Sequence, residues 1–139
     1  MTRQIVPFKR WHMEWLEKRS PTGIAFDSTV SAQLEGQNSW SAVLDGEVIA
    51  CGGTVEQWPG RHTSWTHLGP HTAPHMLWLT REVKNKLKAV KGRVEMTVRC
   101  DFEAGHRWAE MLGFRLETPI MVAYGPEGED QSGYIRINR

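Results

Sequence analysis

A short helical segment between two strand-like segments constrains the fold of this chain more than any other feature. The segment spans residues 103–114, and its apolar residues fall at the i, i+4, i+7 and i+8 positions of one helical face: Ala104, Trp108, Met111 and Leu112. Gly113 is expected to end the helix in the left-handed conformation, and Phe114 to fold back as an apolar contact. The preceding residues 93–99 alternate apolar and polar side chains, as strands do. The sequence therefore predicts a strand, a short helix ended by Gly-Phe, and another strand.

A hairpin is the second clear local signal. Residues 39–44 and 47–55 both have strand-like composition, and Asp45-Gly46 between them tolerates the positive φ angles of a two-residue turn. The pair Gly52-Gly53 in the second strand predicts either a bulge or a close approach of another backbone or a ligand.

The remaining patterns complete the order of elements. Four further strands and two helices are expected: strands at 3–8, 63–68, 119–124 and 134–137, and helices at 11–18 and 73–90. Turns are expected at 20–23 and around Pro59-Gly60, and a Gly-rich loop at 125–133. Residues 24–37 carry no clear pattern, and a helical turn and a loop both remain open for them.

Composition narrows the class of protein. The chain has 139 residues, which suits a single domain over 1–139, and 17 basic against 16 acidic residues leave a net charge of +1. This balance gives no general attraction to nucleic acid or to anionic membranes. Cys51 and Cys100 fall in predicted strands and form no CxxC pair, so we expect reduced cysteines. No apolar run suits a signal peptide or a membrane span, and we expect a cytoplasmic protein.

The order of these elements resembles the GCN5-related N-acetyltransferase (GNAT) superfamily, in which a helix ending in Leu-Gly-Phe follows the fifth strand. The resemblance extends over residues 39–139 and implies an α/β (α+β) fold, with a mixed, mostly antiparallel central sheet of six or seven strands flanked by helices. The chain is most similar to small, divergent members carried by tailed bacteriophages, and three segments carry that similarity: Leu44–Val48, Trp65–Lys88 and Arg107–Phe114. Some of those relatives are acetyltransferases, and others are internal virion proteins.

The resemblance implies acetyl-CoA as co-substrate. In this superfamily the strand before the long helix pairs with the pantetheine arm, and the following turn presents amides to the pyrophosphate. The residues in these places are Thr66, His67 and Leu68 for the pantetheine, and Gly69, His71, Thr72, Ala73 and His75 for the phosphates. The turn departs from the usual glycine-rich pattern, because it has one glycine and two prolines, which donate no amide. Its polar side chains could replace the lost donors, or the turn could be a rigid connector that caps the helix.

The catalytic groups implied by the resemblance are less complete. The tyrosine that protonates the departing thiolate in many members corresponds to Ala109, and a frequent asparagine to Phe102. Tyr124, on the next predicted strand, is a candidate acid or a buried structural tyrosine. Glu56 and His67 are the candidate general bases, or else a surface glutamate and a hydrogen-bonded core histidine.

Two other groupings have a simpler interpretation. His71 and His75 lie four residues apart, but Pro74 stands between them and no third ligand is evident, so no metal site is expected. Trp58, Trp65 and Trp78 are expected near one end of the sheet, where they could line an acceptor pocket or pack in the core.

Two functions follow from the sequence. The first is transfer of an acetyl group from acetyl-CoA to an amine of a small molecule or a host protein. The second is a catalytically inactive GNAT fold that binds a host protein or virion component, for which exposed tryptophans such as Trp11, Trp40 or Trp58 would matter. A nucleic-acid-binding module would rest only on the lysines of the long helix and is the least favoured reading.

Overall fold

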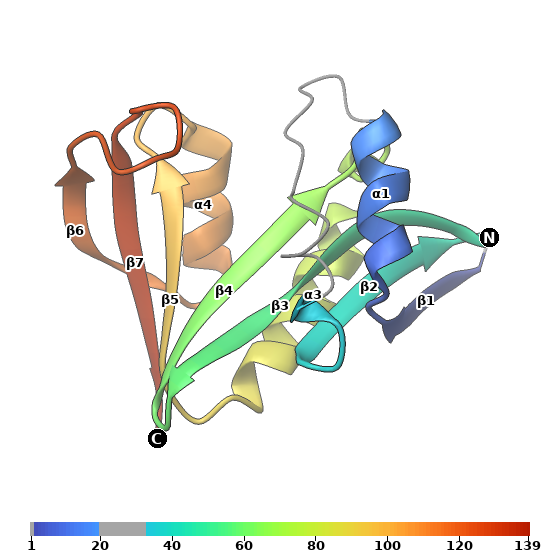
Figure 1. The fold of residues 1–139 in the computed structure, drawn as a ribbon, viewed down its shortest axis with the longest axis horizontal. Coiled ribbons are helices and arrows are strands. Elements are labelled where there is room, and N and C mark those ends of the chain that lie inside the picture. Colours follow the sequence, from blue (N-terminus) through green and yellow to red (C-terminus); the bar gives the residue numbers. More distant parts are fainter. Residues whose placement is uncertain (1, 20–32) are drawn as a thin grey trace. The chain divides into compact units, whose positions relative to one another are not determined.

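The computed structural model describes residues 2–19 and 33–139, and within them the order of elements is the one that the sequence predicts (Figure 1). The elements are β1 (Arg3–Pro7), α1 (Arg10–Arg19), β2 (Asn38–Leu44), β3 (Glu47–Trp58), β4 (Arg61–Leu68), the 3₁₀ turn η1 (Ala73–His75), α3 (Met76–Lys88), β5 (Gly92–Arg99), α4 (Glu103–Met111), β6 (Arg115–Met121) and β7 (Gln131–Asn138). The predicted break at 20–23 and most of the open region 24–37 lie outside the described residues. No helix in the described ranges is long and apolar enough to cross a membrane.

The strands form one mixed sheet in the order β1-β2-β3-β4-β5-β7-β6. Neighbouring strands run antiparallel in the pairs β1/β2, β2/β3, β5/β7 and β6/β7, whereas β4 runs parallel to β5. The predicted α+β class and the mixed, mostly antiparallel sheet are confirmed. The bounds differ in places, because β4 begins at Arg61, the long helix begins with a 3₁₀ turn, and β6 ends at Met121.

The chain divides into two compact units, which we describe separately. The first unit contains residues up to Val55 together with Ser64–Leu79, and the second contains Glu56–Thr63 and Thr80–Arg139. Each unit therefore takes parts of β3, β4 and α3. The single domain expected from chain length stays a prediction.

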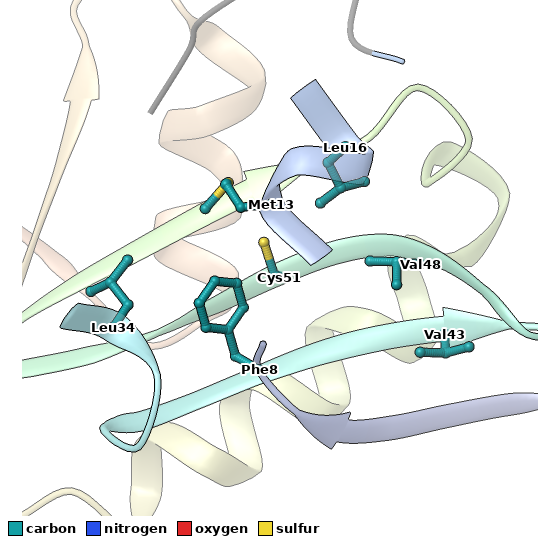
Figure 2. Packing of buried hydrophobic residues seen from close by; sticks show 7 residues of the cluster. All are labelled: Phe8, Met13, Leu16, Leu34, Val43, Val48 and Cys51. Carbon is teal, nitrogen blue, oxygen red and sulfur yellow. The ribbon is translucent and has the colours of Figure 1, made fainter. Parts of the chain in front are cut away.

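The first unit is built on an apolar core beneath α1 (Figure 2). Its buried members come from α1, from β2 and β3, and from the segments that follow β1 and precede β2: Phe8, Met13, Leu16, Leu34, Val43, Val48 and Cys51. Trp65 of β4 packs edge-on against the Phe8 ring, with 5.2 Å between ring centroids. Burial raises the pKa of the Cys51 thiol, which keeps this cysteine protonated and unreactive.

The predicted hairpin between β2 and β3 is confirmed, and the structure adds an extra residue in β3. Asp45 and Gly46 have φ angles of 49° and 84°, as a type I′ turn requires. Ala42 pairs with Ala50 and Val43 with Val48, so Ile49 has no opposite residue and forms the bulge. The bulge therefore lies before Gly52-Gly53. At the two glycines the other prediction holds, which is a close approach of neighbouring atoms. A Cβ atom on Gly53 would lie 2.5 Å from the Asn38 carbonyl oxygen.

The helix α4 ends as predicted but buries a different face. The Gly113 N–H donates to the Glu110 carbonyl and the Phe114 N–H to the Ala109 carbonyl, both at 3.0 Å, which is a Schellman motif. The residues of α4 and its C-cap that are buried are Gly105, Ala109 and Leu112, with Trp108 half-buried, whereas Ala104 and Met111 are exposed. The predicted buried face is therefore wrong by part of a helical turn. Gly105 has no apolar side chain, yet it packs closely against the rest of the unit and belongs to the buried face. A Cβ atom there would lie 2.8 Å from Val98 Cγ1.

Side chains of β7 hold the ends of both helices in the second unit. Asn138 Nδ2 donates to the carbonyl of Leu87, in the last turn of α3, at 2.8 Å and to that of Val90, just after the helix, at 2.6 Å. Arg136 donates from Nη1 to the Leu112 carbonyl at 2.6 Å, and from Nε to Asn138 Oδ1 at 2.9 Å. Carbonyls at helix C-termini lack hydrogen-bond partners within the helix. The side chains of Asn138 and Arg136 supply donors to these carbonyls at the ends of α3 and α4.

A buried histidine joins α1 to β2 in the first unit. The Lys9 backbone N–H donates to His12 Nδ1 at 3.0 Å, and the Ser41 hydroxyl lies 2.7 Å from the same nitrogen. Because Nδ1 accepts the Lys9 N–H, it carries no proton, and the Ser41 hydroxyl also donates to it. Burial lowers the pKa of His12 below the ordinary histidine value of 6.5, so the imidazole is neutral near pH 7 in the folded chain.

The pKa shift of His12 predicts an acid-sensitive fold. The unfolded chain takes up the His12 proton at a higher pH than the folded chain, so the stabilisation present above about pH 6.5 is lost as the pH falls. The free energy of unfolding, measured with urea between about pH 5 and pH 7.5, should depend less on pH in His12→Asn than in the original chain. His71→Gln, which changes an exposed histidine, should keep the original dependence. If the free energy of unfolding changed equally with pH in His12→Asn and in the original chain, the role given to His12 would be wrong.

Candidate functional site

The turn between β4 and α3 is fixed by hydrogen bonds inside the first unit. The Gly69 N–H donates to the Ile49 carbonyl at 2.8 Å, which is the carbonyl of the bulge residue in β3. The Thr72 hydroxyl donates to the Gly69 carbonyl at 3.1 Å, and the His75 N–H donates to the Thr72 carbonyl at 2.8 Å. Three of the predicted phosphate-binding residues are thus brought together by one chain of bonds.

Gly69 is buried and cannot accommodate a larger side chain. A Cβ atom on it would lie 2.8 Å from the Ile49 carbonyl oxygen and 2.9 Å from Leu16 Cδ2. Its amide is already bonded, so it is unavailable to a ligand. Gly69 therefore positions the turn rather than donating from it.

Two exposed residues of the turn present amides that are not used inside the protein. The backbone N–H groups of His71 and Ala73 make no hydrogen bond with the described residues, whereas the Thr72 N–H is turned back toward the Gly69 carbonyl and Thr72 is buried. Ala73 begins the 3₁₀ turn η1, which leads into α3 at Met76, and the partial positive charge of the helical N-terminus adds to that of these amides. Free amides at such a place can bind an anionic oxygen.

An arginine from β1 reaches the same turn, which the sequence analysis did not foresee. Arg3 Nη2 donates to His75 Nδ1 at 3.2 Å, so the proton of the neutral His75 ring is on Nε2. The Arg3 guanidinium also lies 5.6 Å from the centre of the Trp78 ring, a cation–π contact. Only the fold joins residues so far apart in the chain, and no local motif could have indicated the contact.

The three predicted pantetheine residues lie on the last part of β4. Thr66 is exposed, whereas His67 and Leu68 are both partly buried. Burial lowers the pKa of His67, and the nearby Glu17 carboxylate partly opposes that effect. The His67 ring is therefore neutral near pH 7, the state in which a histidine can accept a proton.

The other candidate catalytic residues are placed differently from expectation. Glu56 is exposed near the end of β3. Tyr124 is 59% exposed and follows β6 in a loop, so the predictions that it lies in a strand and is buried are wrong. The strand ends early because the loop after Met121 folds back on itself, with Ala123 at a φ of 52° and its N–H bonded to Asp130. Ala109, at the place of the superfamily tyrosine, is fully buried, and Phe102 is exposed.

A second tyrosine, which the sequence analysis did not single out, is paired with a histidine in the second unit. The Tyr134 hydroxyl lies 2.7 Å from His106 Nδ1, and His106 Nε2 donates to the Cys100 carbonyl at 3.1 Å. With a proton on Nε2, the His106 ring accepts a hydrogen bond from the Tyr134 hydroxyl at Nδ1. Burial raises the pKa of Tyr134. The pair fastens α4 to β7.

The three tryptophans expected at one end of the sheet have separate partners. Trp65 packs on Phe8, Trp78 lies beneath Arg3, and Trp58 stacks on Arg61 at 4.6 Å. Trp58 is 58% exposed. Among residues 2–19 and 33–139, no group of three or more histidine, cysteine or carboxylate side chains could hold a metal ion.

Comparison with known proteins gives structural matches only. No model of a known family matches the chain, and no curated protein matches it. Solved structures match along nearly the whole chain, at 18% identity or less in the three cases that follow.

The first is the ribosomal-protein-S18-alanine N-acetyltransferase from Escherichia coli, with a TM-score of 0.78 at 18% identity, covering 99% of this chain and 96% of the other. The second is yncA from Salmonella typhimurium, solved with its cofactor acetyl-CoA, with a TM-score of 0.75 at 13% identity and coverage of 100% and 95%. The third is an acetyltransferase of the GNAT family from Bacillus anthracis, with a TM-score of 0.68 at 14% identity and coverage of 99% and 95%. At these identities the match establishes the fold, and the chain has the fold of the GNAT acetyltransferases.

Proposed function

We propose that this chain is an acetyltransferase that moves an acetyl group from acetyl-CoA to an amine of a small molecule or a protein. The observation that carries the proposal is the pair of unused amides at His71 and Ala73, at the start of the 3₁₀ turn that leads into α3. A pyrophosphate is a doubly charged anion that accepts hydrogen bonds from such groups. The structural match to yncA, solved with acetyl-CoA, supports the same ligand.

The prolines of the turn are compatible with this proposal. Pro70 and Pro74 lie on either side of the two unused amides and replace neither of them. Their fixed φ angles reduce the freedom of the turn, so fewer conformations are lost when an anion binds. The polar side chains of the turn are mostly committed to the protein, because Thr72 bonds to Gly69 and His75 to Arg3. His71 is exposed and remains available to a phosphate.

The reaction needs a base and an acid. The amine attacks the thioester carbonyl, so that a C–N bond forms, the C–S bond breaks, and one proton leaves the amine while another reaches the thiolate. His67 is neutral near pH 7 and lies on the strand proposed to pair with the pantetheine, so we assign it the role of base. Glu56 and Tyr124 remain the alternative base and the candidate acid.

The context of this activity is also a proposal. The segments Leu44–Val48, Trp65–Lys88 and Arg107–Phe114 resemble divergent bacteriophage members of the superfamily, which would place the chain in the cytoplasm of a host cell. The free thiols of Cys51 and Cys100 suit a reducing compartment of that kind.

The second candidate is a catalytically inactive protein of this fold that binds a host protein or a virion component. Ala109 stands where a catalytic tyrosine is common, and it is fully buried, so no group reaches out from this position. Trp11 and Trp58 are 54% and 58% exposed, as a docking surface requires, whereas Trp40 is only 5% exposed and is excluded from that role.

Calorimetric titration with acetyl-CoA tests the proposed cofactor site. His71→Asp places a carboxylate beside the free amides and should weaken binding at least about tenfold through repulsion of the pyrophosphate. His71→Asn, which is similar in size and uncharged, should stay within about threefold of the original chain. Gly69 is unsuitable for this test, because any side chain there disturbs the turn. Absence of binding at millimolar acetyl-CoA would overturn the acetyltransferase proposal and favour the inactive protein.

The pH dependence of the rate tests the role of His67. Because the base must be neutral, kcat/KM for an accepted amine should rise with pH through a pKa below 6.5. His67→Gln should remove that limb and lower the rate by roughly 10² to 10⁴. His62→Gln, a change on the same strand, should leave the profile unchanged. An unaltered profile in His67→Gln would transfer the role to Glu56, which Glu56→Gln would then test.

A further inference from the structure

The loop between β6 and β7 presents two apolar side chains to solvent in the second unit. Val122 is 78% exposed and Tyr124 is 59% exposed. The two residues are two positions apart in the chain, so their Cα atoms lie at most about 7 Å from each other. Figure 1 shows the loop at the ends of β6 and β7. Neighbouring apolar side chains that are exposed in this way are a common sign of a binding surface.

Hydrogen bonds fix the backbone of this loop. The Gly125 N–H donates to the Glu129 carbonyl at 3.0 Å. The Ala123 N–H, between the two exposed side chains, donates to Asp130 Oδ1 at 2.9 Å. The Cys100 N–H donates to the Asp130 carbonyl at 3.1 Å, which ties the loop to the segment between β5 and α4. The exposed side chains are therefore carried by a fixed backbone, so less conformational entropy is lost when a partner binds.

The same contacts place carboxylates beside the exposed side chains. Asp130 Oδ1 is bonded to the amide of the residue between them. Gly125 directly follows Tyr124, and a Cβ atom built on this glycine would collide with the Glu129 carboxylate. Glu127 is exposed, and its N–H donates to Glu129 Oε2 at 3.0 Å. We call residues 122–130 the acidic loop, because they contain three acidic residues and no basic one.

The carboxylates of the acidic loop are not neutralised by the protein. None of them makes an ion pair with the described residues. A hydrogen bond from its own backbone lowers the pKa of Glu129 most, and the charge of Arg99 has a smaller effect. Arg99 itself lies 3.6 Å from the carboxylate of Asp101, which adds a further acidic residue next to the loop. The near-neutral charge of the whole chain thus hides a local excess of negative charge.

We propose that the acidic loop is a docking surface for a basic polypeptide segment of another protein, whose apolar side chains contact Val122 and Tyr124. The carboxylates attract lysine and arginine side chains and orient their approach. Tyrosine is enriched at protein interfaces, because its ring covers a large apolar area while its hydroxyl still forms hydrogen bonds. The inference concerns binding alone and holds whether or not the chain transfers acetyl groups.

Other classes of ligand fit this surface less well. Nucleic acids and anionic membranes are repelled by carboxylates that have no cationic partner. A metal ion needs several converging ligands, and the described part of the chain has no group of three or more histidine, cysteine or carboxylate side chains that could hold one. A small polyamine would use the charges but leave the two apolar side chains uncovered, whereas a polypeptide segment covers both.

NMR titration of the full chain, with ring-labelled tyrosine as probe, tests the proposal. The chain has two tyrosines, of which Tyr124 is exposed and Tyr134 is buried, so the second ring is an internal control. Tyr124→Phe identifies the two signals. A short synthetic peptide of alternating lysine and leucine should shift the Tyr124 signal in a saturable way and leave the Tyr134 signal unchanged. The glutamate-leucine counterpart should shift neither, and higher salt should weaken the binding.

Two variants separate the charges from the apolar contact. Glu127→Gln/Asp130→Asn removes two charges but keeps a side-chain oxygen at residue 130 for the Ala123 N–H. It should weaken binding of the lysine-leucine peptide at least about tenfold. Val122→Ser, which removes apolar surface, should weaken it at least about threefold.

Matched variants and competing ligands decide the outcome. Glu14→Gln/Glu110→Gln and Leu77→Ser change exposed residues of the same types elsewhere and should leave the affinity unchanged. Equal weakening by these controls, or a Tyr124 signal unmoved by the lysine-leucine peptide, would overturn the proposal. A lysine-serine peptide or spermine that binds as tightly would overturn its apolar part. A Tyr124 signal that moves with protein concentration alone would assign the surface to a second copy of the chain instead of another protein.

Discussion

One hydrogen bond, from the Gly69 N–H to the Ile49 carbonyl, determines what the first unit can do. Ile49 is the extra residue of the bulge and has no opposite residue in β2, and its carbonyl accepts a hydrogen bond from Gly69 at 2.8 Å. The bond forms only because Gly69 lacks a Cβ atom, which would otherwise meet both the carbonyl and Leu16. The hydrogen bond between Gly69 and the bulge residue therefore fixes the start of the turn that follows β4.

The same bond explains why a turn with few glycines can still present amides. Glycine-rich turns allow the backbone to approach a ligand at several residues. Here a single glycine anchors the turn from behind, and Thr72 and His75 continue the anchoring through the Gly69 and Thr72 carbonyls. The amides that remain are those of His71 and Ala73, between the two prolines. The turn has fewer glycines than the usual motif, so it is anchored by different hydrogen bonds. It still presents backbone N–H groups that can donate to an anion.

Local signals predicted most of the elements, whereas contacts between distant residues escaped them. The Asp45-Gly46 turn, the Gly113 stop and the alternation in β5 depend on neighbours in the chain, and all three hold. The buried face of α4 was misread because a glycine, Gly105, packs where periodicity counts only large apolar residues. Tyr124 was misplaced because a loop with a positive φ at Ala123 ends β6 early. The Arg3–His75 contact and the His106–Tyr134 pair have no signature in sequence spacing.

The turn after β4 is fixed by the backbone and by buried contacts in the first unit, so substitutions there act mainly through the fold. Most exposed side chains, by contrast, can be replaced singly at little cost to stability. We therefore expect this chain to tolerate changes at its surface more readily than changes in the turn, because the turn can change only together with the core that supports the first unit.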